Sequence, residues 1–505
     1  MASDKPSTSS HDHDHADVEK VEEIPLPQVL DDKHAFSKAE KWTIVVIIAF
    51  AGLFSPLTAN IYFPAIPTLS IAFHKSTELI NLTVTMYMIL QGIAPMIWGT
   101  LSDNVGRRPV TAACLLVLSL SCVGLALVPT NAYWLLMILR CLQSAGSAST
   151  IAIGAGVVSD ISTPEERAGF FGFFTLGPMV GPAIGPVIGG ALAQGLGWRS
   201  IFWFLCIAAA LCLVMIISIM PETLTAVRYK KDPLSRILYT PLLPIVGRGQ
   251  ANQPSNIPPK KKLQNPLKLF TKPDIVLLLA ITAIICAVFY GIIASISTLF
   301  NDTYDYLNVT TIGLCFLAIG GGMAIGSSIN GKLMDKWFEK EKQRFAKDMA
   351  AAGKQVDMKD LAKNPDFPLE HARLVLLPPM IIILAACTAG YGWALEKRVN
   401  IACPLILQII MGYMCIGVMN ASSTIMIDLV PGQGSAITAC NNLVRCLLSA
   451  ALVSVIQLIF DGIGVGWTYI LLTGLTLLSL PVTYLELKIG PRIRRKRFNA
   501  LTIPN

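Results

Sequence analysis

The chain has 505 residues, of which 53% are hydrophobic and only 14% are charged, and its formal net charge is +8. A soluble globular chain has about 25% charged residues, so this chain has too little polar surface to cover a water-soluble body of its size. The length excludes a secreted disulfide scaffold, and the hydrophobicity excludes a disordered chain. Nucleic-acid binding is disfavoured because the positive charge lies in a few loops and the tail. An integral membrane protein with many spans remains.

Residues 1–41 are polar and contain no apolar run, so we expect a disordered cytosolic tail without a cleavable signal peptide. His and Asp alternate over residues 11–15, a pattern that can bind a metal ion, but no second group of ligands follows and a solvated tail is favoured. The 12 cysteines show no CxxC spacing, which disfavours zinc sites. We expect neither a metal nor a cofactor.

Twelve apolar runs follow, each of about 20 residues, the length that a helix needs to cross about 30 Å of hydrocarbon. Their ranges are 42–66, 79–101, 109–128, 133–158, 168–194, 200–220, 274–300, 309–333, 372–395, 402–427, 435–460 and 466–487. An isolated strand cannot satisfy its backbone in lipid, and no barrel-like alternation is visible. The sequence therefore predicts an all-α membrane protein with twelve transmembrane helices.

Lys and Arg gather in alternate connections, and this asymmetry sets the orientation. If residue 1 is cytosolic, the inner segments hold Arg107 and Arg108, the basic residues of 228–272 and 336–371, and the basic tail. The outer loops then hold only a few basic residues: Lys75, Arg199, Lys397 and Arg398. We therefore expect both termini in the cytosol.

The proline-rich segment 221–273 separates six spans from six and is interpreted as a cytosolic linker. The N-terminal six-helix bundle covers 42–220. The C-terminal bundle covers 274–487, with a charged cytosolic loop at 335–371 and a basic cytosolic tail at 488–505. A repeat supports the division, because Gly99 precedes Asp103 by four residues after the second span, and Gly331 precedes Asp335 likewise after the eighth. Two pseudo-symmetric bundles place a substrate site near the midplane between them.

The loop after the second span carries a longer pattern, made of Gly99, Asp103, Gly106, Arg107 and Arg108. It resembles the G-x-x-x-D-R/K-x-G-R-R/K motif of the major facilitator superfamily, with Asn104 in place of a basic residue. The resemblance implies the major facilitator fold and a gating role on the cytosolic side for these residues and for Gly331 and Asp335. In that family Asp103 would face the start of the eleventh helix, here near Gly434 and Ser435. A turn with a positive-inside signal would explain only the two arginines.

The fourth span carries Arg140 and Gln143, followed by Ser144 and Gly146. These residues resemble the superfamily motif R-x-x-Q-G-x-G, with Ser144 in the place of a glycine. An Arg deep in a span is costly in lipid and should face the cavity. Two roles stay open for it: proton coupling or anion contact, and a structural hydrogen-bond anchor.

Glycines recur every fourth residue in the fifth span, with prolines beside them. The spacing puts them on one helix face as a groove for a close partner, which the eighth span offers at Gly322 and Gly326. The stretch resembles the superfamily pattern G-x8-G-x3-G-P-x2-G-G, which is typical of antiporters and implies an exporter. Its members here are Gly172, Gly177, Gly181, Gly185, Pro186, Gly189 and Gly190. Ordinary tight packing is the alternative.

Finer resemblance extends over nearly the whole chain from the first span onward. Stretches such as 60–64, 199–203, 221–224, 391–393 and 441–446 are similar to the fungal twelve-span drug:proton antiporters. Within that group the quinidine-resistance type is the most similar. The fungal citrate exporters are close relatives that share several of the stretches.

Polar side chains within spans are expected to line a water-filled cavity. The candidates are Asn60, Tyr87, Gln91, Tyr290, Gln408, Asn420, Asn441 and Asn442, together with Arg140, Gln143 and Arg445. No Asp or Glu stands at the centre of a predicted span, although proton-coupled exporters commonly need a buried titratable group. Asp103 or Asp428, working with one of the two arginines, could carry the proton, or transport is uncoupled.

The leading hypothesis is an alternating-access exporter of amphipathic drugs, toxins or secondary metabolites, with proton antiport implied by resemblance. The alternative is an exporter of a small organic acid such as citrate, which two arginines in spans would suit. A non-transporting nutrient sensor fits poorly, because the C-terminal tail of about 18 residues is short for a signalling domain. An enzyme is disfavoured, because no carboxylate pair, His cluster or Ser/Lys dyad falls at membrane depth.

We expect a monomer that handles a small-molecule substrate and protons in a lipid bilayer, by resemblance the plasma membrane. Asn301 and Asn308 begin glycosylation sequons in the outer loop before the eighth span. Such short motifs often go unused, so their occupancy stays open.

Overall fold

The computed structural model describes residues 36–163, 166–224, 239–243, 246, 266–351, 366–430 and 434–502. Most of the predicted N-terminal tail, most of the predicted linker, residues 352–365 of the charged loop and residues 503–505 lie outside this part. In the described ranges twelve helices are long and apolar enough to cross a membrane, and no strand occurs. The predicted all-α fold class is confirmed, and the domain boundaries stay a prediction.

The N-terminal half begins where Ser37 and Glu40 form a capping box, the Glu40 carboxylate accepting from the Ser37 N–H at 2.8 Å. Its elements are α1 (Lys38–Asn60), η2 (Phe63–Ala65), α2 (Ile66–Phe73), α3 (Thr77–Val105), α4 (Arg107–Leu127), α5 (Tyr133–Ile161), α6 (Arg167–Leu196) and α7 (Arg199–Ile219). The first candidate span runs through α1, η2 and α2 and is longer than the predicted 42–66. It is interrupted at η2, where Pro64 has no amide hydrogen to donate.

The C-terminal half contains η3 (Pro266–Thr271), α10 (Pro273–Thr303), α11 (Val309–Ala351), α12 (Leu369–Leu374), α13 (Leu377–Glu396), α14 (Ala402–Leu429), α15 (Gly434–Ile463) and α16 (Val465–Thr502). Two helices extend far beyond their predicted spans, whereas the others differ by a few residues. α11 continues through the first part of the predicted charged loop, and α16 continues through most of the predicted basic tail. Both extensions are rich in Lys, Arg, Glu or Ala, which favour helices.

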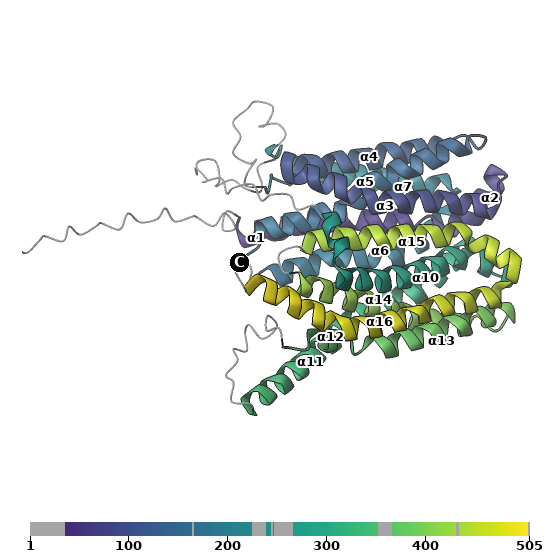
Figure 1. Ribbon diagram of the computed structural model, residues 1–505. Coiled ribbons are helices and arrows are strands. Elements are labelled where there is room, and N and C mark those ends of the chain that lie inside the picture. The colour runs from purple at the N-terminus through teal and green to yellow at the C-terminus, as the bar shows by residue number, and fades with distance from the viewer. Residues whose placement is uncertain are drawn as a thin grey trace, which may run out of the picture.

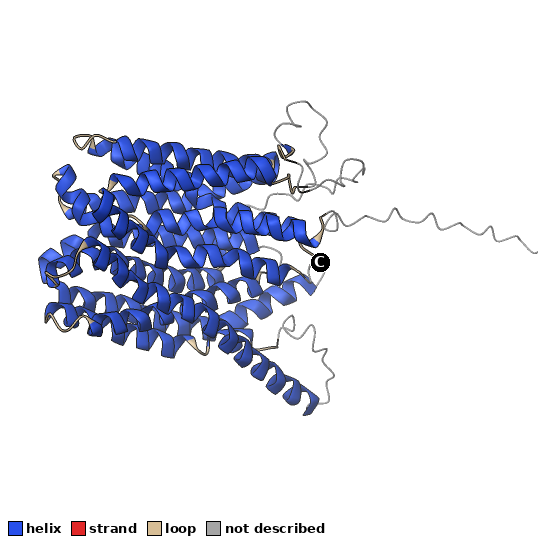
Figure 2. Cartoon of the chain, turned by 180° about the vertical axis from the view of Figure 1, so that it is seen from behind, coloured by secondary structure: helices blue, strands red, loops and turns tan. Residues whose placement is uncertain are grey.

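The helices lie side by side in one bundle with two distinct ends (Figure 1). We call the end where α1 begins and α16 finishes the terminal side, and the opposite end, with its short connections, the hairpin side. Figure 2 shows the same arrangement from behind, with α11 projecting away from the bundle on the terminal side.

Helix pairings in one half recur in the other. The pairs α1–α6, α3–α5, α4–α5 and α4–α7 correspond to α10–α15, α11–α14, α13–α14 and α13–α16. The halves meet along two seams of the same kind, α3 against α15 and α6 against α11. This repeated pairing is the pseudo-symmetry that the sequence repeat predicts.

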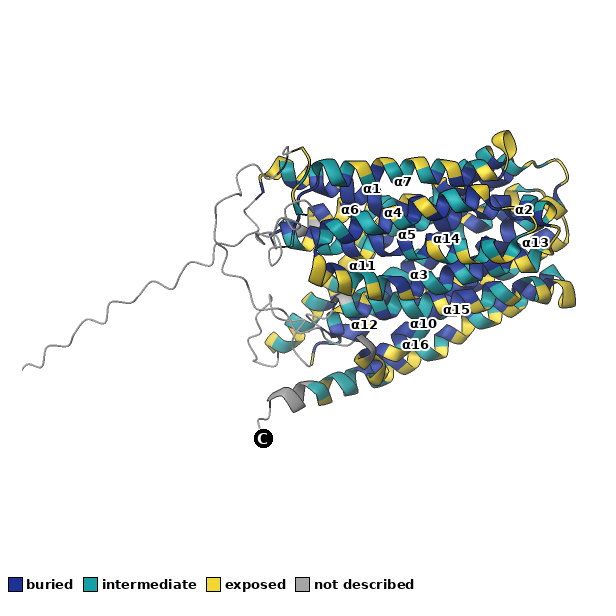
Figure 3. Cartoon of the chain, turned by 90° about the horizontal axis from the view of Figure 1, so that it is seen from above, coloured by how far each residue is buried: buried dark blue, intermediate teal, exposed yellow. Residues whose placement is uncertain are grey.

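Exposed residues lie along the outermost helices (Figure 3), and many of them are large and apolar. On α7 the large exposed side chains Ile207, Leu211 and Val214 lie three or four residues apart and therefore on one face. A water-soluble helix would carry polar groups there, whereas a hydrocarbon surrounding favours this pattern.

Candidate functional site

The seam between α3 and α15 is tight from the hairpin side to the middle of the bundle. Thr85 Oγ1 lies 3.4 Å from the Ala450 carbonyl oxygen, and the Asn442 side-chain amide donates to the Gln91 carbonyl oxygen at 2.8 Å. Further toward the terminal side, a Cβ added at Gly99 would meet no described atom within 4 Å. The two helices therefore separate toward the terminal side.

The seam between α6 and α11 follows the same course. A Cβ added at Gly190 would lie 2.6 Å from the Val309 carbonyl oxygen, and one at Gly320 would lie 2.6 Å from Ala183. Toward the terminal side, Cβ atoms added at Gly172 or Gly331 would meet no described atom within 4 Å. Both seams are closed on the hairpin side and open on the terminal side.

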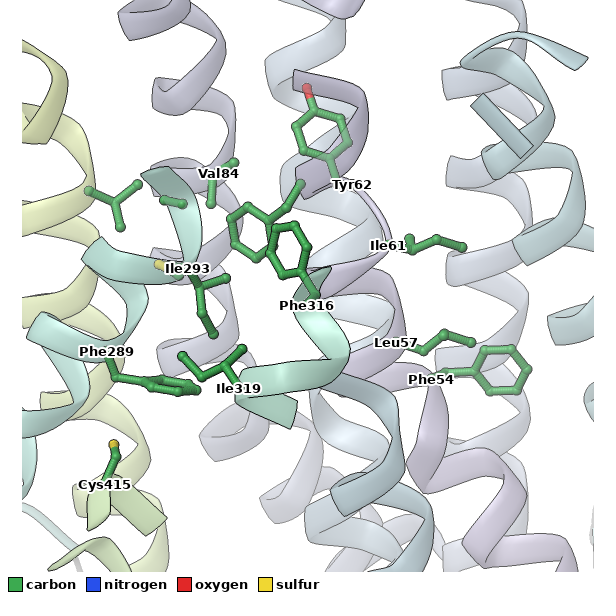
Figure 4. Packing of buried hydrophobic residues seen from close by; sticks show 14 of the residues in the cluster. Phe54, Leu57, Ile61, Tyr62, Val84, Phe289, Ile293, Phe316, Ile319 and Cys415 are labelled. Carbon is green, nitrogen blue, oxygen red and sulfur yellow. The ribbon is translucent and has the colours of Figure 1, made fainter. Parts of the chain in front are cut away.

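Aromatic and aliphatic side chains fill the space between the halves on the hairpin side. The rings of Phe63 in η2 and Phe316 in α11 stack with centroids 6.5 Å apart. Figure 4 shows Ile319 of α11 on the side of Phe289 and Ile293 of α10, and Phe316 of α11 on the side of Val84 and Tyr62 of the N-terminal half. Within the described chain, this buried apolar layer closes the space between the halves on the hairpin side.

The glycine face of α6 packs against α1, within the N-terminal half. Cβ atoms added at Gly177, Gly181 and Gly189 would lie 2.4 Å from the Ala49 carbonyl oxygen, 2.6 Å from the Pro56 ring and 2.0 Å from the Ile61 carbonyl oxygen. The expectation that Gly322 and Gly326 of α11 cover this face is wrong, because they meet α14. Periodicity identifies a helix face but does not say which helix covers it.

Arg140 lies in α5 and is fully buried. Its Nη1 donates to Gln143 Oε1 at 2.5 Å, and its guanidinium carbon lies 4.1 Å from the ring centre of Tyr62 and 4.4 Å from that of Tyr87. Nε and Nη2 have no hydrogen-bond partner in the described chain. Two aromatic faces thus replace the carboxylate that a buried cation usually requires.

Arg445 lies in α15 beside the α3–α15 seam and is half-buried. Its Nε and Nη2 both donate to Asn442 Oδ1, at 3.1 and 2.8 Å. The same Asn442 donates across the seam to the Gln91 carbonyl oxygen, and Tyr290 and Cys286 of α10 lie near Arg445. Arg445, Asn442 and Gln91 therefore form one hydrogen-bonded chain between the halves.

The structure brings together only some of the predicted cavity residues. Tyr87 contacts Arg140, while Gln91, Asn442, Tyr290 and Arg445 gather at the α3–α15 seam. The other predicted residues bond within one half or line the terminal side. Asn60 donates to the Pro56 carbonyl oxygen, Gln408 to Tyr391, and Asn441 to Ser423, while Asn420 lines a pocket described below.

The predicted gating loop forms an ion-pair network on the terminal side of the N-terminal half. Arg107 lies 2.6 Å from Asp103 and 3.0 Å from Asp160 at the end of α5. Its guanidinium rests on Gly156, where an added Cβ would lie 2.7 Å from it. Asp103 is thus held by Arg107, its neighbour one turn along.

Glu222 caps the start of α4. Its carboxylate accepts from the backbone N–H groups of Arg107 at 2.9 Å and Arg108 at 3.1 Å. Burial raises the pKa of Glu222, and the N–H donors of Leu224, Arg107 and Arg108 oppose that rise. Gly106 permits the approach, because its φ is +128° and a Cβ there would lie 2.5 Å from the carboxylate.

The C-terminal half carries a copy of this network. Arg373 of α12 lies 3.0 Å from Asp428 at the end of α14 and 3.9 Å from Asp335 on α11. Asp428 is thus paired with Arg373, and Asp103 with Arg107, rather than with Arg140 or Arg445. Next to this network lies a pocket of about 260 Å³, lined by Gly331, Met334, Asp335, Arg373, Asn420, Ser423, Thr424 and Ile427.

Sequence reasoning missed Asp160 and Arg373, which complete the two networks. In the N-terminal half, the spacing of four residues between Asp103 and Arg107 is typical of an ion pair along a helix. The long charged segment between Asp335 and Arg373 removes that spacing in the second half.

The two sequon residues lie on the hairpin side. Asn301 is exposed in the last turn of α10, and Asn308 Oδ1 accepts from the Thr311 N–H at 2.9 Å at the start of α11. Their glycosylation stays a prediction.

Comparison with known proteins gives a consistent assignment. Residues 48–347 match the family model of the Major Facilitator Superfamily. Citrate exporter 1 of Aspergillus niger is 37% identical over 498 residues, covering 95% of this chain and 93% of that protein. The MFS antiporter QDR2 of Candida albicans is 32% identical over 472 residues, covering 92% and 90%.

Solved structures share the fold at low sequence identity. A D-xylose–proton symporter superposes with a TM-score of 0.63 at 14% identity, covering 88% of this chain and 97% of that one. The human organic anion transporter MFSD10 gives a TM-score of 0.53 at 17% identity, covering 88% and 99%.

Proposed function

The chain belongs to the major facilitator superfamily, and we propose that within it the protein exports organic anions, with Arg445 as the residue that first contacts the anion. It is a multi-pass membrane transporter, and its relatives include proteins named as MFS antiporters and as citrate exporters. Substrate class, direction and coupling are the proposed parts.

The observation that carries the proposal is the charge between the halves. Two guanidinium groups, of Arg140 and Arg445, lie in the spans, and no Asp or Glu stands at the centre of any predicted span. A lipophilic cation would need a carboxylate to offset its charge in this surrounding, whereas an anion needs the arginines. The organic-acid alternative from the sequence is therefore favoured over a cationic drug, and carboxylated secondary metabolites fit equally.

The two arginines differ in access. Arg140 is fully buried behind the rings of Tyr62 and Tyr87, whereas Arg445 is half-buried next to the seam that opens to the terminal side. We assign the first contact to Arg445 and a supporting positive field to Arg140.

Anion binding would act directly on the seam. A carboxylate on Arg445 competes with Asn442 Oδ1 for the same guanidinium donors. Asn442 is then free to reorient, and its hydrogen bond to the Gln91 carbonyl oxygen across the seam weakens. Substrate that enters from the terminal side would thereby loosen the closed part of the seam, as alternating access requires.

Localisation and coupling complete the proposal. We place the terminal side in the cytosol of a plasma-membrane protein, following the distribution of Lys and Arg. Release on the other side then makes the protein an exporter. Relatives named as antiporters support exchange for a second solute, which we propose to be the proton.

The test is efflux from proteoliposomes preloaded with labelled citrate or, separately, with a labelled amphipathic cation. We expect saturable citrate efflux that falls about 10- to 100-fold in Arg445→Gln, because charge-assisted hydrogen bonds are worth about 1.5–3 kcal/mol. Arg492→Gln, which removes an exposed guanidinium from α16, is the matched control and should leave efflux unchanged. Efflux of the cation without citrate, or full activity of Arg445→Gln, would overturn the proposal.

A further inference from the structure

Three buried carboxyl groups lie together on the terminal side of the C-terminal half, away from the seams. Asp274 begins α10, Glu370 lies in α12, and Glu486 lies in α16; each is 0% exposed. We call these three residues the carboxylate cluster. Burying three acids in one place is costly unless each charge is balanced or removed.

Two of the three are balanced by arginines from the end of α16. Arg494 Nε lies 3.0 Å from Glu370 Oε1, and its Nη2 lies 3.2 Å from Glu370 Oε2. Arg497 Nη2 lies 2.8 Å from both carboxylate oxygens of Asp274. These bonds dock the extension of α16 onto the starts of α10 and α12.

Glu486 has no such partner. Neither of its carboxyl oxygens has a hydrogen-bond donor among the described residues. The side chain lies over Gly490, where an added Cβ would be 2.7 Å from Glu486 Oε1 and 3.1 Å from Glu370 Cγ. It therefore points into the cluster, toward two other acids.

The charged groups around Glu486 can be counted element by element. α16 supplies Arg494 and Arg497, α10 supplies Asp274 with Lys272 beside it, and α12 supplies Glu370. Lys272 interacts with Asp274 and Arg497 rather than with Glu486. Both arginines bond to the other two acids, so an ionised Glu486 would be a buried negative charge without a hydrogen-bonded cation among the described residues.

A metal ion does not fit this position. No group of three or more His, Cys, Asp or Glu side chains in the described chain is arranged to hold one. Two of the carboxylates are already occupied by bidentate arginine contacts. A proton needs only one oxygen and removes the unbalanced charge.

We propose that Glu486 binds a proton, and that the carboxylate cluster with Arg494 and Arg497 is a proton-binding site on the terminal side of the C-terminal half. The proton neutralises the third acid and lets the extension of α16 dock with only two arginines. Losing it places a negative charge beside Glu370 and Asp274, which attracts the arginines away from their present partners. The site is independent of the cargo.

Infrared spectroscopy of the purified full-length protein tests the site directly. The wild-type protein should show the C=O stretch of a protonated carboxylic acid near neutral pH, and this signal should lose one titrating group in Glu486→Gln. Glu339→Gln, which removes an exposed acid on α11, should keep the signal. An unchanged signal in Glu486→Gln would overturn the proposal, as would its absence from the wild type.

Thermal unfolding gives a second readout that needs no transport. A folded state that holds a proton more tightly than the unfolded chain loses stability as pH rises. The melting temperature should therefore fall more steeply between pH 6 and about 9 in the wild type than in Glu486→Gln, which stays uncharged. An equal fall of the melting temperature with pH in the two proteins would count against the proton-binding site. Replacing choline with sodium should change neither protein; sodium-dependent stabilisation that Glu486→Gln loses would show a sodium site instead.

Discussion

The two halves end on the terminal side in charged clusters that can be compared residue by residue. Arg107 with Asp103 and Asp160 in one half corresponds to Arg373 with Asp335 and Asp428 in the other. Each half also buries a Glu after or near the end of its last span. Glu222 receives backbone N–H donors at the start of α4, whereas Glu486 receives none among the described residues.

The comparison shows that a repeat can keep its ion pairs and change how a buried acid is accommodated. The N-terminal half uses the free amide groups of a helix start, which favour a negative charge. The C-terminal half offers arginines to two acids and, by our proposal, a proton to the third. Variants made in matched pairs test this difference between the two halves.

The largest difference is expected from removing the central arginine of each network. Arg107→Ala leaves Asp103 and Asp160 without their close partner, and we expect a loss of about 2–3 kcal/mol in unfolding free energy. Arg373→Ala should cost about half as much, because Asp335 is 82% exposed and lies 3.9 Å away. Chemical or thermal unfolding of the two purified variants measures both values. Equal losses would show that distance and exposure do not set the strength of these networks.

A smaller difference is expected from the two glycines that lie under the buried acids. Gly106→Ala forces a side chain into a φ of +128° and against Glu222, so we expect a loss of about 1–3 kcal/mol. Gly490→Ala meets the flexible end of Glu486 and should cost less than about 1 kcal/mol. The melting temperatures of the two variants show which substitution costs more stability. A larger loss in Gly490→Ala than in Gly106→Ala would contradict the expected order.

The smallest effect is the pH dependence that Glu222 contributes. Because burial raises its pKa, the folded protein holds this proton more tightly than the unfolded chain does. The stability that this proton contributes is complete below the pKa of Glu in the unfolded chain, about 4.3. It is lost as pH rises through the higher pKa of Glu222 in the folded protein. Glu222→Gln should flatten that part of the stability profile. The change should be smaller than in Glu486→Gln, since the amide donors oppose the effect of burial; a larger change would contradict the assigned difference.

The fold could be predicted almost entirely from the sequence, because hydrophobic runs of span length and the repeated Gly-x-x-x-Asp are local patterns. The site could be predicted only in part. Arg140 and Arg445 stand out as charges in apolar runs, but the partners that complete the charge networks are remote. Arg107 and Asp160 are 53 residues apart, and Arg373 and Asp428 are 55 apart. Only the packing of helices brings such pairs together.

Glu486 shows a second limit of sequence reasoning. It lies at the end of a predicted span, where an acid is unremarkable in a sequence. Its burial depends on Gly490 and on the extension of α16, which the sequence predicts to be a basic tail. The helical extension of α11 was missed for the same reason, since charged residues that favour helices also fill loops.

That extension of α11 has a mechanical consequence. At 43 residues the helix is about 65 Å long, roughly twice the thickness of the hydrocarbon layer. It begins at the seam beside Gly190 and projects from the bundle on the terminal side. It therefore forms a long helical arm of the C-terminal half. If the halves rock about the level of Arg445, as the proposed alternating access requires, the far end of α11 would move further than any residue within the membrane. Opening and closing of the seams would therefore produce a larger displacement at this helix end, outside the bundle, than at the seams themselves.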